Sequence, residues 1–183
     1  MLAALVTPAL VLIVRDKLKA KTNSVHVQPI SPINPINPAH ENLKAFLTMI
    51  QYAEGTYGQN AYRMLYGGKL FGDYSVHPNT AVTKGGVTST AAGAYQILYR
   101  TWQSVQPVLA LPDFSPTSQD RAAIELVRRR GALEDVMAGR FGDALYKCRK
   151  EWASLPGAGY GQGERSWDYL VQVYQNAGGQ ITV

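Results

Sequence analysis

The first strong pattern of apolar and polar positions covers residues 41–53, where apolar side chains recur at helical spacing. Leu43, Leu47 and Ile50 fall on one stripe, and Gly55 follows the last periodic residue. This arrangement is typical of an amphipathic helix that buries one face and ends at a glycine. We therefore predict a helix over 41–53 that packs against the core of a folded domain.

The helical period is lost between residues 57 and 93. Glycine and proline interrupt this segment repeatedly, and only short apolar runs remain, for example at residues 69–71 and 81–83. Short runs separated by turn residues are typical of strands and tight turns. The sequence therefore predicts a small, turn-rich β region after the first helix.

Helical periodicity returns after residue 93 and continues almost to the end of the chain. Ser115 followed by Pro116 is a typical N-cap with proline in the first turn, and prolines at 107 and 112 would end the helix before it. The predicted helices cover residues 94–109, 116–129, a short stretch before Gly139, 143–153 and 164–176. One helix, a small β excursion and then several helices predict an α+β domain that is mostly helical.

Residues 1–40 differ from the rest of the chain. Residues 2–14 are almost wholly apolar, residues 15–21 carry four bases and one acid, and prolines recur at 29, 32, 35 and 38. Proline at every third position favours an extended spacer. We therefore divide the chain into an apolar and basic segment at 1–21, a linker at 22–40 and a folded domain at 41–183.

The role of segment 1–21 has more than one interpretation. Thirteen apolar residues match the core of a signal peptide and fall short of a comfortable membrane span. The segment would then be a signal or an anchor that associates with the inner membrane. A loose extension or a misassigned start would also explain it.

Charge separates the same two parts of the chain. The whole sequence has 18 bases and 13 acids, a net charge of +5. Four bases and one acid precede residue 41, so the arm carries +3 and the domain carries only +2. A nucleic-acid binder is the alternative that composition suggests, and the nearly balanced domain argues against it. The single cysteine excludes an internal disulfide framework, and we expect a monomer.

Several common kinds of functional motif are missing. His26, His40 and His77 have no cysteine or carboxylate at metal-ligand spacing, so we expect neither a metal site nor a cofactor. Cys148 lies on an apolar helical stripe and is interpreted as a small buried residue, not as a nucleophile. The basic run 128–130 is interpreted as a solvated helix end that the helix dipole favours.

Glu54 is the carboxylate with the most unusual position. It lies seven residues after Leu47 and four after Ile50, on the apolar stripe of the first helix, and glycine follows it. A carboxyl group against an apolar wall has its charged form disfavoured and its pKa raised. That property suits a general acid near neutral pH. The alternative is a partly exposed residue at a helix end.

A second patch, at residues 89–97, combines small residues with a neutral amide at the start of a predicted helix. Neutral donors and acceptors beside flat aromatic rings suit a sugar ligand. The candidate binding residues are Ser89, Thr90, Gly93, Tyr95 and Gln96, with Tyr57, Tyr74 and Tyr160 as further aromatic faces.

Six segments follow one another in an order that resembles the phage lambda-type endolysins: residues 53–56, 67–78, 89–96, 113–120, 130–133 and 152–162. The element Gly93-x-x-Gln96-Ile97 is also similar to one found in lytic transglycosylases more widely. The resemblance covers residues 41–179 and leaves the arm unexplained. It implies a lysozyme-like fold with a small β subdomain beside the active-site cleft.

The resemblance also implies an activity. Such enzymes cleave the β-1,4 bond between N-acetylmuramic acid and N-acetylglucosamine in peptidoglycan, and their catalytic glutamate matches Glu54. As lytic transglycosylases they leave a 1,6-anhydro product and lyse the host cell. We assign Gln96, Tyr95, Ser89, Thr90, Gly93 and Tyr160 to substrate binding, with Asp73 either orienting the cleft or shaping a turn.

Three alternatives to this activity stay open. A hydrolytic muramidase could cut the same bond with Asp73 or another carboxylate as the second acid. A virion-associated protein could bind or degrade the wall as part of a particle. The nucleic-acid binder is the third. If the protein is an endolysin, we expect it to be located in the host cytoplasm or at the inner membrane and to act in the periplasm on the cell wall.

Overall fold

The computed structural model describes residues 37–161 and 163–182, so segment 1–21 and most of the predicted linker lie outside the described residues. Helix α2 (Pro38–Glu54) is the first element, and the Asn37 side chain accepts a hydrogen bond from the Ala39 N–H at 3.1 Å. The helix begins at 38, not at the predicted residue 41, because proline is well suited to the first helical position. The end of the proline-rich stretch therefore belongs to the folded part.

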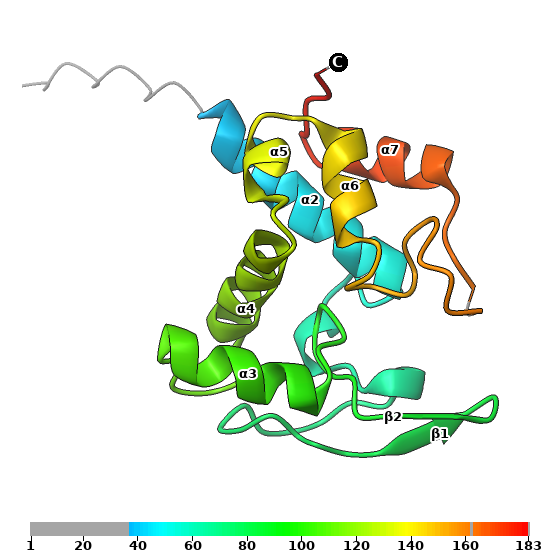
Figure 1. Cartoon of the computed structure of the whole chain (residues 1–183). Helices are drawn as coiled ribbons and strands as arrows, with labels where there is room; N and C mark the ends of the chain where they lie inside the picture. The colour runs from blue at the N-terminus through cyan, green and yellow to red at the C-terminus, as the bar shows by residue number, and fades with distance from the viewer. Residues whose placement is uncertain (1–36, 162, 183) are drawn as a thin grey trace, which may run out of the picture. The chain divides into compact units, whose positions relative to one another are not determined.

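Helix α2 is the central helix of the described part. Helices α5 (Leu133–Met137) and α7 (Trp167–Asn176) pack against it (Figure 1). Leu47 and Ile50 of the predicted stripe are buried, and Leu43 packs against the same core. Helix α6 (Phe141–Cys148) closes this group with the Phe141 ring, whose centroid lies 4.7 Å from that of Tyr174.

Helix α4 (Pro116–Arg129) joins this group to the rest of the domain. It contacts α2 and α5 as well as α3 (Tyr99–Leu109), and it runs between them in Figure 1. Beside α3, the rings of Trp102 and Phe114 pack edge to face at 4.8 Å. The predicted start of α4 is confirmed: Ser115 takes the N-cap position before Pro116, although its side chain makes no capping hydrogen bond.

The predicted β region is small and mostly irregular. Strands β1 (Val82–Lys84) and β2 (Val87–Ser89) pair antiparallel with Lys84 opposite Val87. Gly85 and Gly86 form the turn with φ of 58° and 80°, a conformation that a tight two-residue hairpin requires. The other apolar run, 69–71, contributes only an isolated bridge between Met64 and Leu70, beside the short 3-10 helices η1 (Ala61–Arg63) and η2 (Tyr66–Gly68).

Three further helices have boundaries that differ from the prediction. Helix α3 begins at Tyr99, not at 94, because Gly93 and Gln96 have φ of 78° and 46° and form a tight loop. Helix α6 covers Phe141–Cys148 instead of 143–153, and α7 begins at Trp167 instead of 164. Pro107 lies inside the last turn of α3 instead of ending it.

The fold class is confirmed: the described residues form a mostly helical α+β unit with one two-stranded sheet. Among residues 37–161 and 163–182, no helix combines the length and apolar character that crossing a membrane needs.

Candidate active site

Glu54 is the last residue of α2 and faces a cleft of about 620 Å³. The helix stops here because Gly55 adopts the left-handed conformation, with φ of 72°. The cleft is lined by the end of α2, by residues 64–68, by the β1–β2 hairpin, by Gln96 and by the loop 153–165. The predicted position of Glu54, between the first helix and the β region, is therefore confirmed.

The surroundings of Glu54 raise the pKa of its carboxyl group to about 7. Burial is the largest cause, since it disfavours the charged form. Two smaller effects lower the pKa: the Ser154 hydroxyl donates a hydrogen bond to Oε1 at 2.6 Å, and the positive charge of Arg165 lies nearby. With a pKa near 7, both the acid and the carboxylate are accessible at neutral pH.

The other charged groups that line the cleft among the described residues are cations. Lys84 enters from the hairpin, and Arg165 enters from the loop, where its Nε donates to the Ala53 carbonyl at 3.1 Å. Glu54 is the one carboxylate in the described part of this lining. The chemistry that the cleft offers is therefore proton transfer at a single carboxyl group.

Gln96 is the one member of the predicted patch 89–97 that lines the cleft. Its Nε2 donates to the carbonyls of Met64 and Gly93, at 3.1 and 3.0 Å. These bonds fix the side chain between two loops, although its backbone φ of 46° is unusual for a residue other than glycine. The position agrees with the predicted binding role and makes Gln96 part of the cleft wall.

Tyr95 does not line the cleft around Glu54 but a neighbouring groove, and its contact with substrate stays a prediction. Its side chain is 1% exposed, and its hydroxyl donates to Asp120 at 2.6 Å and accepts from Gln51 Nε2 at 3.2 Å. Since the positive φ of Gln96 turns the chain at this point, neighbouring side chains point to different surroundings. Tyr95 therefore supports the wall from behind.

Ser89, Thr90 and Gly93 also shape the wall instead of lining the cleft. The Ser89 hydroxyl accepts from the Ala91 N–H at 3.1 Å, and Thr90 Oγ1 accepts from the Tyr99 N–H at 3.2 Å, at the start of α3. A Cβ on Gly93 would lie 2.1 Å from Gln119 Oε1. Only glycine fits there.

Gln119 explains this crowding and was missed from the sequence. Its side chain is fully buried on α4. Its Oε1 accepts from the Ala94 N–H at 2.9 Å, while Nε2 donates to the carbonyls of Tyr62 and Phe114, at 3.0 and 2.8 Å. One amide thus joins three loops near the cleft. Gln119 lies within segment 113–120, which resembles lambda-type endolysins, but the sequence does not indicate these contacts.

Asp73 lies in an exposed turn and does not line the cleft. Its Oδ1 accepts from the Ser75 N–H at 2.9 Å, and its other oxygen accepts from the Ser75 hydroxyl. These bonds lower the pKa of Asp73. Of the two predicted roles, the structure agrees with the one in which Asp73 shapes a turn.

Tyr160 belongs to the glycine-rich loop and is 53% exposed. Its ring lies 5.4 Å from Lys150 Nζ, in a groove next to the cleft. The same loop is held by Glu164, whose carboxylate accepts from the N–H groups of Gly157 and Gly159 at 2.8 and 2.7 Å. Gly161 lines the cleft itself.

Ser154 and Arg165 are further residues that sequence reasoning missed. Ser154 lies within the 152–162 segment that resembles lambda-type endolysins, so the motif contained it without indicating its contact with Glu54. Arg165 lies far from Glu54 in the sequence and carries no pattern. Only the folded chain brings the two residues to the carboxyl group.

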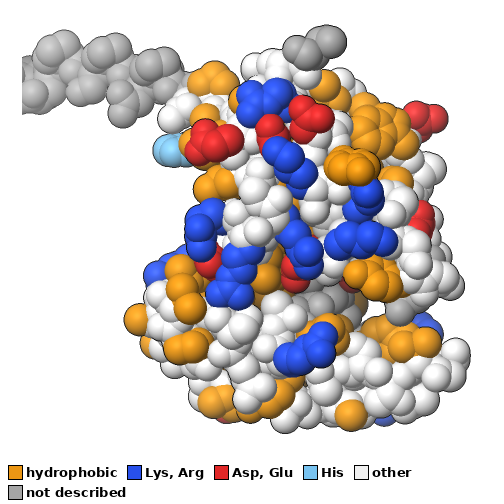
Figure 2. All heavy atoms as spheres, viewed as in Figure 1, with side chains coloured by type: hydrophobic (Ala, Val, Ile, Leu, Met, Phe, Trp, Pro, Cys, Tyr) orange, Lys and Arg blue, Asp and Glu red, His pale blue; other side chains and the backbone are white. Residues whose placement is uncertain are grey.

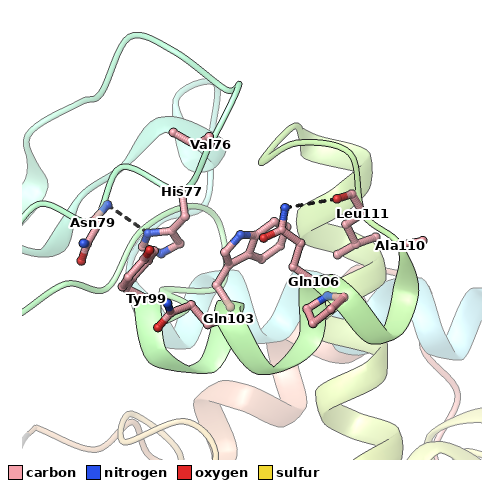
Figure 3. Close-up of a pocket in the computed structure, with 10 residues that line it drawn as sticks. Val76, His77, Asn79, Tyr99, Gln103, Gln106, Ala110 and Leu111 are labelled. Atoms are coloured by element: carbon pink, nitrogen blue, oxygen red, sulfur yellow. Dashed lines mark hydrogen bonds between the residues drawn. The ribbon is translucent and has the colours of Figure 1, made fainter.

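A second groove, of about 680 Å³, lies beside α3 and away from Glu54 (Figure 3). His77 lines it, with Nε2 bonded to the Ile97 carbonyl at 2.9 Å and Nδ1 accepting from the Asn79 N–H at 3.0 Å. Burial lowers the pKa of His77, so the ring is neutral with both nitrogens occupied. None of the predicted site residues lines this groove.

Cys148 and the basic run 128–130 lie outside the cleft and make contacts within the fold. Cys148 is buried, as predicted, and burial raises the pKa of its thiol to about 12. In the run 128–130, Arg128 and Arg129 pair with Glu125 at 2.6 and 2.9 Å, and Arg130 pairs with Glu151. In the described ranges no three His, Cys, Asp or Glu side chains come together as a metal site would need.

The comparisons with known proteins agree with this architecture. A family model for endolysins matches residues 44–181. The endolysin of Escherichia phage P2 is 47% identical over 156 residues, covering 76% of this chain and 94% of that protein. The endolysin of Escherichia phage lambda is 43% identical over 145 residues, covering 75% of this chain and 92% of that protein.

A solved structure of lambda lysozyme in complex with a chitohexasaccharide superposes with a TM-score of 0.74 at 41% identity. It covers 84% of this chain and 100% of that one. A second structure of lambda lysozyme gives a TM-score of 0.71 at 40% identity. The resemblance and the lysozyme-like fold are thus confirmed. The chain belongs to the endolysin family, the phage enzymes that degrade the bacterial cell wall, and it has the fold of lambda lysozyme.

Proposed function

We propose that this endolysin is a lytic transglycosylase that cleaves the β-1,4 bond between N-acetylmuramic acid and N-acetylglucosamine in peptidoglycan. The observation that carries the proposal is Glu54, a carboxyl group with a pKa near 7 at the floor of an open cleft. The chitohexasaccharide held by lambda lysozyme, a protein of the same fold, supports a glycan as the ligand of this cleft.

The reaction needs one proton donor that later becomes a proton acceptor. Protonated Glu54 first donates its proton to the glycosidic oxygen as the bond from the anomeric carbon to that oxygen breaks. The 6-hydroxyl of the same muramic acid then attacks the anomeric carbon, and the Glu54 carboxylate accepts the hydroxyl proton. The products are a 1,6-anhydro-muramoyl end and a free 4-hydroxyl on N-acetylglucosamine, and no water is consumed.

The surroundings of Glu54 fit this double use. Burial makes the acid form available at neutral pH, while the Ser154 hydroxyl and the Arg165 charge stabilise the carboxylate that forms once the proton has left. Intramolecular attack gains from proximity, since the nucleophile belongs to the sugar already bound. A second carboxylate is not required.

Hydrolysis of the same bond is the second candidate. It requires a water molecule that a base positions on the opposite face of the sugar, or a carboxylate nucleophile. Asp73, the residue considered for this role, has its carboxylate engaged by Ser75 outside the cleft lining. This placement favours transglycosylation over a mechanism that uses Asp73.

The first experiment is the clearance of purified cell walls by Glu54→Gln. We expect the loss of nearly all activity, because glutamine keeps the shape but cannot donate and then accept the proton. Glu41→Gln, on the first turn of the same helix, is the matched control and should clear walls like the unaltered protein. Equal activity of Glu54→Gln and the unaltered protein would contradict the role of Glu54.

The protein's route to the wall is also a proposal. We propose that segment 1–21 associates with the inner membrane and that linker 22–40 holds the catalytic domain off the bilayer until it is released to act on the wall in the periplasm. We also propose that the protein acts as a monomer. The basic excess of the arm, +3 from four bases and one acid, supports attachment to an anionic membrane surface and favours the cytoplasmic side for the domain before release. Recovery of the full chain in the soluble fraction of host cells would contradict it.

A further inference from the structure

A groove of about 410 Å³ opens beside the catalytic cleft, between the start of α3, the end of α4 and residues 150–160. We call it the side groove. Gln96 and Ala153 line both the side groove and the cleft, so the two depressions meet at these residues. A ligand in the cleft can therefore extend a branch into the side groove.

The side groove carries an excess of positive charge. Arg100, Arg130 and Lys150 line it together with a single carboxylate, Glu151, which leaves a net charge of +2 from three cations and one anion. Figure 2 shows further basic side chains gathered over α4 and α6. This charge favours an anionic ligand.

Contacts within the protein position two of the three cations. Arg130 Nε donates to Glu151 at 2.8 Å and its Nη2 donates to the Lys150 carbonyl at 3.3 Å. Lys150 Nζ donates to the Ala158 carbonyl and lies over the Tyr160 ring. Both charges are thus held at the groove before any ligand arrives, which reduces the entropy cost of binding.

Arg100 differs from the other two cations. It lies in the first turn of α3, its side chain is exposed, and it makes no ion pair or side-chain hydrogen bond with another described residue. An exposed guanidinium on a fixed helix can pair with a carboxylate through two parallel hydrogen bonds.

The rest of the lining is mixed, with Gln96 and Thr101 as neutral polar residues. Ile97, Leu126 and Trp152 are buried and contribute to the groove. A lining of cations, neutral polar groups and a few apolar side chains suits a short ligand that combines amides and small apolar groups with carboxylates. A long polyphosphate needs a continuous basic path. The side groove is too small for one, and the carboxylate of Glu151 interrupts its row of cations.

We propose that the side groove binds the acidic peptide stem that peptidoglycan carries on N-acetylmuramic acid. This inference rests on the proposed function, because it requires a muramoyl glycan in the cleft. A strand bound there must direct its stems away from the sugar path. The side groove meets the cleft at Gln96 and Ala153, and it offers the charge that carboxylates of the stem require.

Stem binding predicts a preference among glycans. Strands with peptide stems should be bound more tightly than the same strands without them, because the stem adds contacts outside the sugar path. Since the cations are exposed, added salt should reduce this preference. The chemical step should be unaffected, because Arg100 does not line the cleft around Glu54.

The test compares KM and kcat on two substrates: soluble glycan strands with intact stems, and the same strands after an amidase has removed the stems. Arg100→Gln should raise KM on the stem-bearing strands about twofold to fivefold, the range expected for one exposed ion pair. Arg100→Glu should raise it further. Neither variant should change KM on stem-free strands or kcat on either substrate.

Lys44→Gln is the matched control, because Lys44 is an exposed cation on α2 that lines neither depression. Equal changes on both substrates, or no change with Arg100→Glu, would overturn the stem proposal and leave the proposed function standing. Failure of the unaltered protein to cut either substrate would instead contradict the proposed function. Loss of binding to a DNA duplex by Arg100→Glu, with KM unchanged on strands, would show a nucleic-acid site and overturn the stem proposal.

Discussion

Removal of the Ser154 hydroxyl tests how the protein sets the pKa of Glu54. The hydroxyl donates to Glu54 Oε1 at 2.6 Å, a length typical of a hydrogen bond to a charged oxygen. Such bonds contribute about 1.5–3 kcal/mol, and about 1.4 kcal/mol corresponds to one pKa unit. Because the cleft is open and water can replace part of the bond, we expect Ser154→Ala to raise the pKa by about one unit.

The higher pKa of Glu54 in Ser154→Ala should shift the pH dependence of activity, because the protonated form of Glu54 is the active one. Bond cleavage needs protonated Glu54, so kcat/KM is high below the pKa and falls as pH rises through it. In the unaltered protein this fall should be centred near the pKa of about 7. Ser154→Ala should move it toward 8 and extend activity to more alkaline pH. The assay is kcat/KM on soluble glycan strands across this pH range.

Ser75→Ala is the matched control, because it also removes a serine hydroxyl bonded to a carboxylate, that of Asp73 outside the cleft lining. Its pH profile should match that of the unaltered protein. A shift of the Ser154→Ala profile toward acidic pH, or no shift, would refute the reasoning about Glu54. A shift with Ser75→Ala would assign Asp73 a role in the reaction.

Three further predictions concern stability. In urea denaturation, Gly93→Ala should lower the free energy of unfolding by about 3 kcal/mol or more, because the new Cβ meets the Gln119 side chain. Gly131→Ala is the control: its φ is also positive, at 66°, but a Cβ there meets no other atom, so the free energy of unfolding should fall by only about 1–2 kcal/mol. Tyr95→Phe should cost about 1–2 kcal/mol and leave KM unchanged, since the hydroxyl bonds within the core; a higher KM would indicate a substrate contact. Glu54→Gln should stabilise the protein by up to about 3 kcal/mol at pH 8 and by little at pH 4. The reason is that Glu54 ionises above about pH 4.5 in the unfolded chain but only above about pH 7 in the folded protein, so the folded state loses stability as the pH rises between these values. The same gain at both pH values would contradict this.

The position of Glu54 could be predicted because it depends on local pattern. The apolar stripe of α2 and the glycine after it determine both the buried face and the end of the helix. A carboxyl group on that stripe at that end must lie against apolar surroundings. Helical spacing and a glycine stop were therefore sufficient to predict where Glu54 lies, and its catalytic role came from the family resemblance.

The cleft wall could not be predicted to the same detail. The segment 91–98 has helix-forming residues, yet Gly93 and Gln96 take positive φ. The Met64 carbonyl accepts from the Gly93 N–H and from Gln96 Nε2, and Gln119 Oε1 accepts from the N–H of Ala94 between them. These partners are distant in sequence, and propensity carries no information about them. The helix was therefore predicted to begin too early, and Tyr95 was placed at the cleft.

Ser154 and Arg165 were missed for a related reason. Each acts on Glu54 across about a hundred residues of chain, from a loop whose glycines allow many conformations. A serine or an arginine in such a loop has no distinguishing spacing. The fold must be known before their effect on a carboxyl pKa can be inferred.

The central claim is that Glu54 acts alone and that the sugar's own hydroxyl is the nucleophile. The most direct measurement is mass spectrometry of peptidoglycan fragments after digestion in water labelled with heavy oxygen. Transglycosylation by Glu54 yields 1,6-anhydro-muramoyl ends that contain no label, because no water enters the bond. Labelled reducing ends, heavier than the anhydro product by one water, would contradict it and establish hydrolysis.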